Sequence, residues 1–132
     1  MLKSCLAGCL LLLVQTPAIA GNIAKPTVIN TAKTSGMPTG ENQQITVLTA
    51  TLKPGDQTPL HTHRFPVTVY VLGGTFTLEM DGREMVSVSA GQSMVEPPNV
   101  KMTGYNKSAS EDMRVVIFYV SDPDTPFLDR AH

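Results

Sequence analysis

The fold of this chain is indicated by the stretch PLHTHRFPVTVYVLGGTF, residues 59–76. Two histidines two positions apart precede a run of β-branched and aromatic residues, and the run ends at a glycine pair. Side chains two apart on a strand project from the same face, about 6.7 Å apart along it. His61 and His63 are therefore expected to point to one side, where two imidazoles can share a metal ion.

The sequence around this stretch predicts an all-β domain. Segments rich in β-branched residues, or with alternating apolar residues, recur about every eight to twelve residues with turn signals between them, which is typical of a sandwich or barrel. Asp81-Gly82 is a strong hairpin signal, and no window has a convincing helical period. The expected strands are residues 44–53, 65–72, 75–80, 83–89, 92–96, 100–106 and 113–120, with a further short strand at 27–29.

The first 20 residues have the features of a secretory signal peptide. Lys3 precedes an uninterrupted run of apolar or small residues, 5–14, and Ala18 and Ala20 form a small-x-small cleavage signal. The run is too short to span a membrane, which takes roughly 20 apolar residues. We therefore expect cleavage after Ala20 and a periplasmic or secreted protein, without stable membrane insertion. A lipoprotein acylated at Cys9 is the alternative.

The remaining chain is expected to form one small domain, with an N-terminal arm (residues 21–43), a β-barrel (44–120) and a turn-rich C-terminal tail (121–132). Both cysteines lie within the first 20 residues, so the mature domain has no disulfide and no thiolate ligand. The whole chain has 10 basic and 11 acidic residues. This balance argues against nucleic acid or an anionic membrane surface as the main partner.

The chain resembles the cupin family, through two motifs that occur in order. The first cupin motif is Gly-x5-His-x-His-x3–4-Glu-x6-Gly, and Gly55, His61, His63 and Gly74 occupy its places. The resemblance covers roughly residues 45–120. It implies a small single-domain cupin, an RmlC-like jelly roll in which a double-stranded β-helix forms the barrel.

The second cupin motif is Gly-x5-Pro-x-Gly-x2-His-x3-Asn, and here the chain departs from the family pattern. Gly91, Pro97 and Asn106 match it, whereas Asn99 replaces the turn glycine and Met102 replaces the histidine. Asparagine tolerates a positive φ better than most residues, so the turn is expected to survive.

The first motif also departs at a metal-ligand position, because Val67 stands where the family has its glutamate. The resemblance therefore implies a degenerate metal site that retains His61 and His63. With Met102 as a third ligand, two imidazoles and a thioether favour copper over harder ions. Without a metal, Val67 and Met102 are packing residues around an apolar pocket. Glu96, just before Pro97, replaces the missing carboxylate if its side chain turns inward.

Three functions remain open on this evidence. The first is an exported cupin that binds a small molecule in the barrel, with His61, His63, Val67, Met102 and Glu96 around the pocket. The second is a metal-dependent oxidative enzyme of copper or iron type, using His61, His63 and Met102. The third is a non-catalytic structural or interaction protein. Small cupins often dimerise through their sheets, so a homodimer is expected.

Overall fold

The computed structural model describes residues 21–132 and confirms the all-β prediction: nine strands and no helix occupy this part of the chain. The predicted signal peptide and the alternative lipid-attachment site lie outside the described residues. The strands are β1 (Gln44–Leu52), β2 (His61–Thr62), β3 (Val67–Gly73), β4 (Thr75–Met80), β5 (Val86–Ser89), β6 (Ser93–Glu96), β7 (Met102–Tyr105), β8 (Met113–Ser121) and β9 (Asp129–Arg130). No helix within residues 21–132 is long and apolar enough to cross a membrane.

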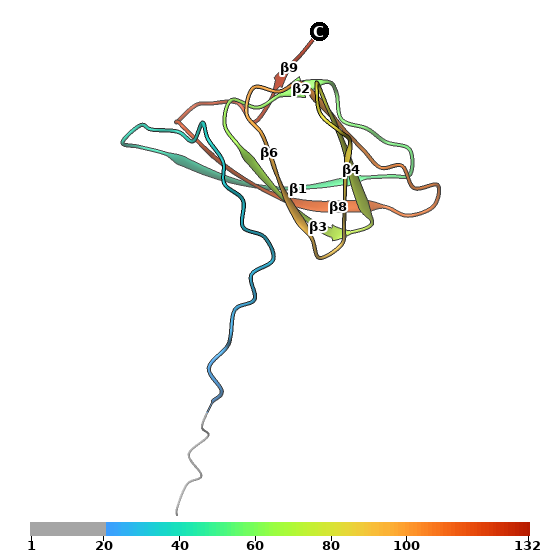
Figure 1. Cartoon of the computed structure of the whole chain (residues 1–132), viewed down its shortest axis with the longest axis horizontal. Coiled ribbons are helices and arrows are strands. Elements are labelled where there is room, and N and C mark those ends of the chain that lie inside the picture. The colour runs from blue at the N-terminus through green and yellow to red at the C-terminus, as the bar shows by residue number, and fades with distance from the viewer. Residues whose placement is uncertain (1–20) are drawn as a thin grey trace, which may run out of the picture.

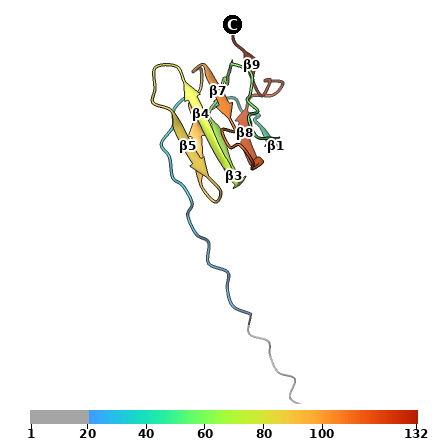
Figure 2. The same cartoon turned by 90° about the vertical axis from the view of Figure 1, so that its right-hand side faces the viewer.

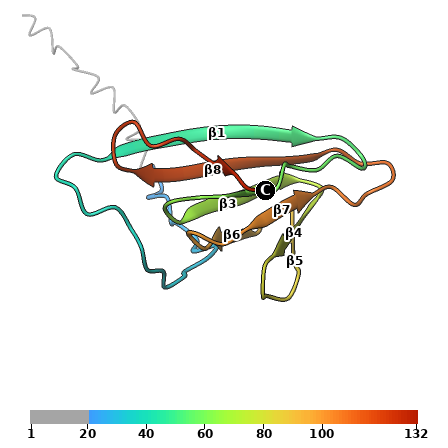
Figure 3. The ribbon, with the colours of Figure 1, turned by 90° about the horizontal axis from the view of Figure 1, so that it is seen from above.

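The strands form two antiparallel sheets that enclose the core (Figures 1 and 2). One sheet has the order β1-β8-β3-β6, and the other has the order β5-β4-β7-β2-β9. Neighbours in each sheet are mostly distant in sequence, as in a jelly roll. Figure 3 shows β1, β8 and β3 lying side by side along the length of the domain.

Alternation along the strands explains which side chains form the core. Val67, Val69 and Val71 on β3 are buried and belong to one core cluster with Phe76 and Leu78 of β4, while the intervening β3 residues Thr68 and Tyr70 are more exposed. An antiparallel strand with one face on the core produces this period of two. Burial of these aliphatic and aromatic side chains stabilises the domain without a disulfide.

The glycine pair between β3 and β4, Gly73 and Gly74, has a steric role. Gly74 has a φ of +71°, and a Cβ built there would lie 2.7 Å from Asp112 O and 3.0 Å from Met113 Cα. Only glycine has both the backbone freedom and the small size for this corner. It allows the chain to leave β3 and enter β4 beside the start of β8. Asn99, as expected, adopts a positive φ of 59°.

Two of the nine strands were not among those expected from sequence. β2 contains His61 itself, and β9 belongs to the C-terminal tail. Both are only two residues long, so neither has a recognisable period. β9 pairs with β2 and so places the tail across one end of the barrel (Figure 1).

Candidate functional site

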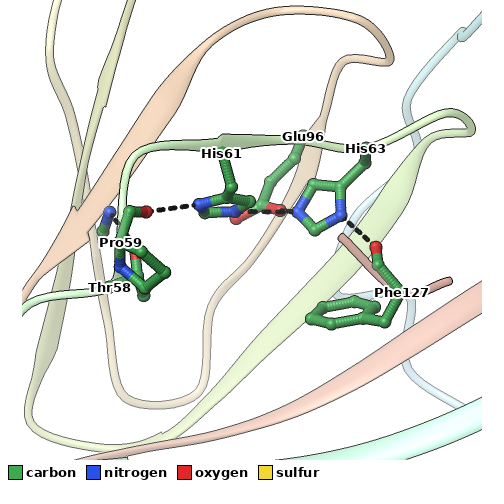
Figure 4. Close-up of polar contacts among 7 residues, drawn as sticks. Thr58, Pro59, His61, His63, Glu96 and Phe127 are labelled. Atoms are coloured by element: carbon green, nitrogen blue, oxygen red, sulfur yellow. Dashed lines mark hydrogen bonds and ion pairs between the residues drawn. The ribbon is translucent and has the colours of Figure 1, made fainter. Parts of the chain in front are cut away.

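Two imidazoles and a carboxylate meet inside the barrel at the end covered by the tail. His61 Nε2 lies 3.1 Å from His63 Nε2, and His63 Nε2 lies 3.1 Å from Glu96 Oε2 (Figure 4). All three residues are almost fully buried, with exposed fractions of 5%, 1% and 4%. The two histidines thus lie on the same side, as their spacing predicted.

Strand pairing explains why the carboxylate reaches the histidines. Glu96 on β6 is directly opposite Val67 on β3, and opposite residues in an antiparallel pair project from the same face. The position that lacks the family's glutamate therefore has a glutamate as its cross-strand neighbour. Glu96 was expected to replace the missing carboxylate if its side chain turned inward, and in the structure this side chain lies inside the barrel beside His63.

Backbone carbonyls fix the orientation of both rings. His61 Nδ1 lies 2.8 Å from Pro59 O, and His63 Nδ1 lies 2.6 Å from Phe127 O. A carbonyl oxygen only accepts hydrogen bonds, so each Nδ1 donates and carries a proton. In a neutral imidazole the other nitrogen then has a free lone pair. When both rings are neutral, the two Nε2 atoms therefore present lone pairs to each other and to the carboxylate.

This arrangement is suited to a cation. Two lone pairs 3.1 Å apart, beside a buried carboxylate, repel unless a metal ion or a proton lies between them. Burial lowers the pKa of His61 from its usual value, and the nearby His63 lowers it further, against opposing effects of Pro59 O and Glu96. The lowered pKa favours the neutral imidazole, which is the form that binds metal.

The three side chains are in contact in series, with His63 in the middle. Within residues 21–132, no three His, Cys, Asp or Glu side chains already form a metal-holding group. These three side chains nevertheless have the composition that transition metals use, namely two imidazoles and one carboxylate. The hydrogen bonds of the imidazoles to Pro59 O and Phe127 O are of the kind that orients histidines in metal sites.

A mostly apolar cavity of about 110 Å³ adjoins this cluster. Aliphatic and aromatic side chains from both sheets form its walls, and the cluster supplies His61, His63 and Glu96 at one side. The tail contributes Phe127 and Leu128 to its wall. A cavity of this kind suits a small ligand with an apolar body and one polar group.

The other two predicted pocket residues lie beside the cluster. Val67 is fully buried, opposite Glu96, and packs in the core. Met102 is 1% exposed and lies opposite His61 in the β2–β7 pairing, in the same core. Neither residue is among those that line the cavity. Met102 as a metal ligand remains a prediction.

Phe127 is a site residue that the sequence did not indicate. Its carbonyl orients His63, and its ring packs on the same imidazole with 4.8 Å between ring centroids. The tail that contains it lacks any periodic pattern, and the contact joins residues 64 positions apart. No local signal in the sequence predicts such a contact.

The two facing antiparallel sheets and their strand order place this structure in the class of double-stranded β-helix proteins. The chain belongs to the cupin family: the family model described as cupin domain matches residues 48–119, more than half of the chain. This fold supports a small ligand-binding protein. A search of curated proteins finds no match.

Solved structures agree with this assignment. An RmlC-like cupin from Methanocaldococcus jannaschii is 25% identical, with a TM-score of 0.52 over 60% of this chain and 70% of its own. A Klebsiella pneumoniae protein with a double-stranded β-helix domain is 18% identical, with a TM-score of 0.57 over 76% and 84%. The DMSP lyase DddQ from Ruegeria pomeroyi is 14% identical, with a TM-score of 0.57. The match covers 66% of this chain and only 43% of the lyase chain.

Proposed function

We propose that this protein is a metal-binding cupin that holds a small, mostly apolar molecule next to the metal. His61, His63 and Glu96 are the proposed metal ligands. The observation that carries this proposal is the pair of Nε2 atoms 3.1 Å apart, with their Nδ1 atoms bonded to carbonyls and a buried carboxylate beside them. Such a pair needs a cation.

The donor set also bears on which metal is bound. Imidazoles and a carboxylate suit zinc or iron, whereas copper is favoured if the Met102 thioether takes part. When bound, the metal supplies a Lewis acid for a donor atom of the ligand. The protein's own part is to keep both imidazoles neutral and oriented, and to exclude water with apolar walls.

The oxidative-enzyme hypothesis gains support from Glu96. Two histidines and one carboxylate are the ligand set of non-haem iron oxygenases. The class of reaction remains a proposal, because one fold supports many chemistries.

A second candidate is a binder of apolar molecules that holds a proton in place of the metal. It is favoured by the series arrangement, in which His63 contacts both His61 and Glu96. The site would then be a remnant, and its polar groups would anchor the ligand.

Calorimetric titration of the chelator-treated protein with zinc, iron(II) and copper(II) distinguishes the two candidates. Metal binding predicts one equivalent per chain, lost in His61→Ala and in His63→Ala. Copper preference that disappears in Met102→Leu would indicate that the thioether is a ligand. If none of the three ions binds, the metal-free candidate replaces the first.

We also propose that two copies pair through β1. Within residues 21–132 this strand has only β8 as a neighbour, and its nine residues include no charge, proline or glycine. Ile45 and Val47 project from it into solvent, with exposed fractions of 73% and 57%. Natural edge strands usually carry protective charges, and antiparallel pairing with a second β1 would satisfy this edge symmetrically.

Sedimentation of the wild-type domain is therefore expected to give a dimer, and Val47→Lys is expected to give a monomer. Val86→Lys, on β5 in the other sheet, is the control and should remain dimeric. If the wild type is still a monomer at a concentration of about 100 μM, roughly 100 times a micromolar dissociation constant, the proposal is contradicted.

Export is proposed from the first 20 residues. The apolar run followed by Ala18 and Ala20 should lead to cleavage after Ala20. Intact mass of the protein recovered from outside the cytoplasm should correspond to a chain that begins at Gly21. A mass that corresponds to a diacylated Cys9 would show a lipoprotein instead.

A further inference from the structure

The C-terminal tail is part of the cavity wall although it lies beyond the matched cupin domain, which ends at residue 119. It is fastened to the barrel at several points. β9 pairs with β2, Ala131 N donates to Leu60 O over 3.0 Å, and Arg64 Nε donates to Asp129 Oδ2 over 3.0 Å. The tail is therefore held in a defined place over the site.

Within the tail, Phe127 is the side chain that lines the cavity next to His63. Its ring lies 4.8 Å from the His63 ring and 5.6 Å from the Tyr119 ring, measured between centroids. Its carbonyl accepts the hydrogen bond of His63 Nδ1, so the backbone here is fixed as well. Figure 4 shows the ring next to His63. A ring held from two sides is a rigid boundary.

We propose that Phe127 determines the size of the ligand, and that the cavity accepts a compact, mostly apolar molecule no larger than benzene. This inference rests on the proposed function in that it assumes a ligand in the barrel. The cavity of about 110 Å³ is smaller than an apolar protein cavity of about 150 Å³ that binds benzene or xenon. Phe127→Ala removes roughly six carbon atoms from its wall.

The experiment compares xenon, benzene and naphthalene binding to the mature chain by changes in amide and methyl NMR signals. Wild type should bind xenon or benzene and should not bind naphthalene. Phe127→Ala should bind naphthalene at concentrations at least about tenfold below the highest one at which wild type shows no binding, because the added space takes a second ring. If the alanine variant does not fold, Phe127→Leu replaces it in the experiment. Because leucine is still a large apolar side chain, its gain in naphthalene binding should be smaller.

Phe65→Ala is the matched control. Phe65 also packs against Tyr119, with 6.4 Å between ring centroids, but it is not among the residues that line the cavity. It should not acquire naphthalene binding. If wild type binds naphthalene as well as Phe127→Ala does, the size limit is overturned and ligand binding in the barrel stands. If no probe binds to any variant, the ligand-binding function itself fails.

Discussion

Glu96→Gln is expected to remove most of the metal-dependent stabilisation of this protein. At a metal concentration of about 100 times the wild-type dissociation constant, binding should stabilise the wild type by about 2.7 kcal/mol. In a domain of this size the melting temperature should then rise by roughly 10–20 °C. Loss of the only anionic ligand should weaken binding at least about hundredfold. The stabilisation would then fall to about 0.4 kcal/mol at the same metal concentration, as thermal denaturation can measure.

An exchange of the two cross-strand residues provides the sharper control. Val67 and Glu96 are opposite each other and almost fully buried. Glu96→Val should lose the metal response, and Val67→Glu alone should be destabilised by a second buried carboxylate. The double variant with both changes should recover metal binding, because the carboxylate returns to the family's usual strand. If Glu96→Gln keeps the full response and Met102→Leu loses it, the ligand set includes Met102 in place of Glu96.

The second large effect is expected at Gly74, where alanine should destabilise the domain by about 3 kcal/mol or more. Two causes add. A non-glycine residue at a φ of +71° is strained by about 1 kcal/mol, and the new Cβ would lie 2.7 Å from Asp112 O. A backbone atom cannot turn away as a side chain can, so the β3–β4 corner must move from β8. The melting temperature should fall by roughly 10–20 °C.

Gly82→Ala separates these two causes. Gly82 has nearly the same φ, +69°, and no described atom lies within 4 Å of a Cβ at that position. This variant should lose only about 1 kcal/mol, because the backbone strain acts alone. Equal losses in the two variants, measured by denaturant unfolding, would contradict the steric role of Gly74.

The fold could be predicted from the sequence because its signals are local. Alternation in residues 75–80 and the Asp81-Gly82 turn are each visible within a few residues. The seven expected segments between residues 44 and 120 each contain a strand in the structure, whereas the short strand expected at 27–29 is wrong, because those residues are exposed and pair with no strand. The two short strands β2 and β9 could not be predicted, since two-residue strands are defined only by their partners.

The candidate site was predictable in part, for the same reason. His61 and His63 share a face because of their spacing along one segment. The orientation of Glu96 depends on the register between β3 and β6, which are not consecutive strands. Sequence alone does not specify that register across the intervening β4 and β5. Phe127 depends on the path of a tail without periodicity.

The cross-strand position of Glu96 has a consequence for how metal centres are recognised in β-proteins. A sequence motif assigns each ligand to one position in the chain, whereas metal binding depends only on where the donor atoms lie in space. In a sheet, each inward-facing residue has a cross-strand neighbour whose side chain reaches nearly the same point. When the motif position lacks its glutamate, a glutamate at the cross-strand position can thus supply the carboxylate. Chains dismissed for lacking one motif ligand should be examined at the residue that pairs with it.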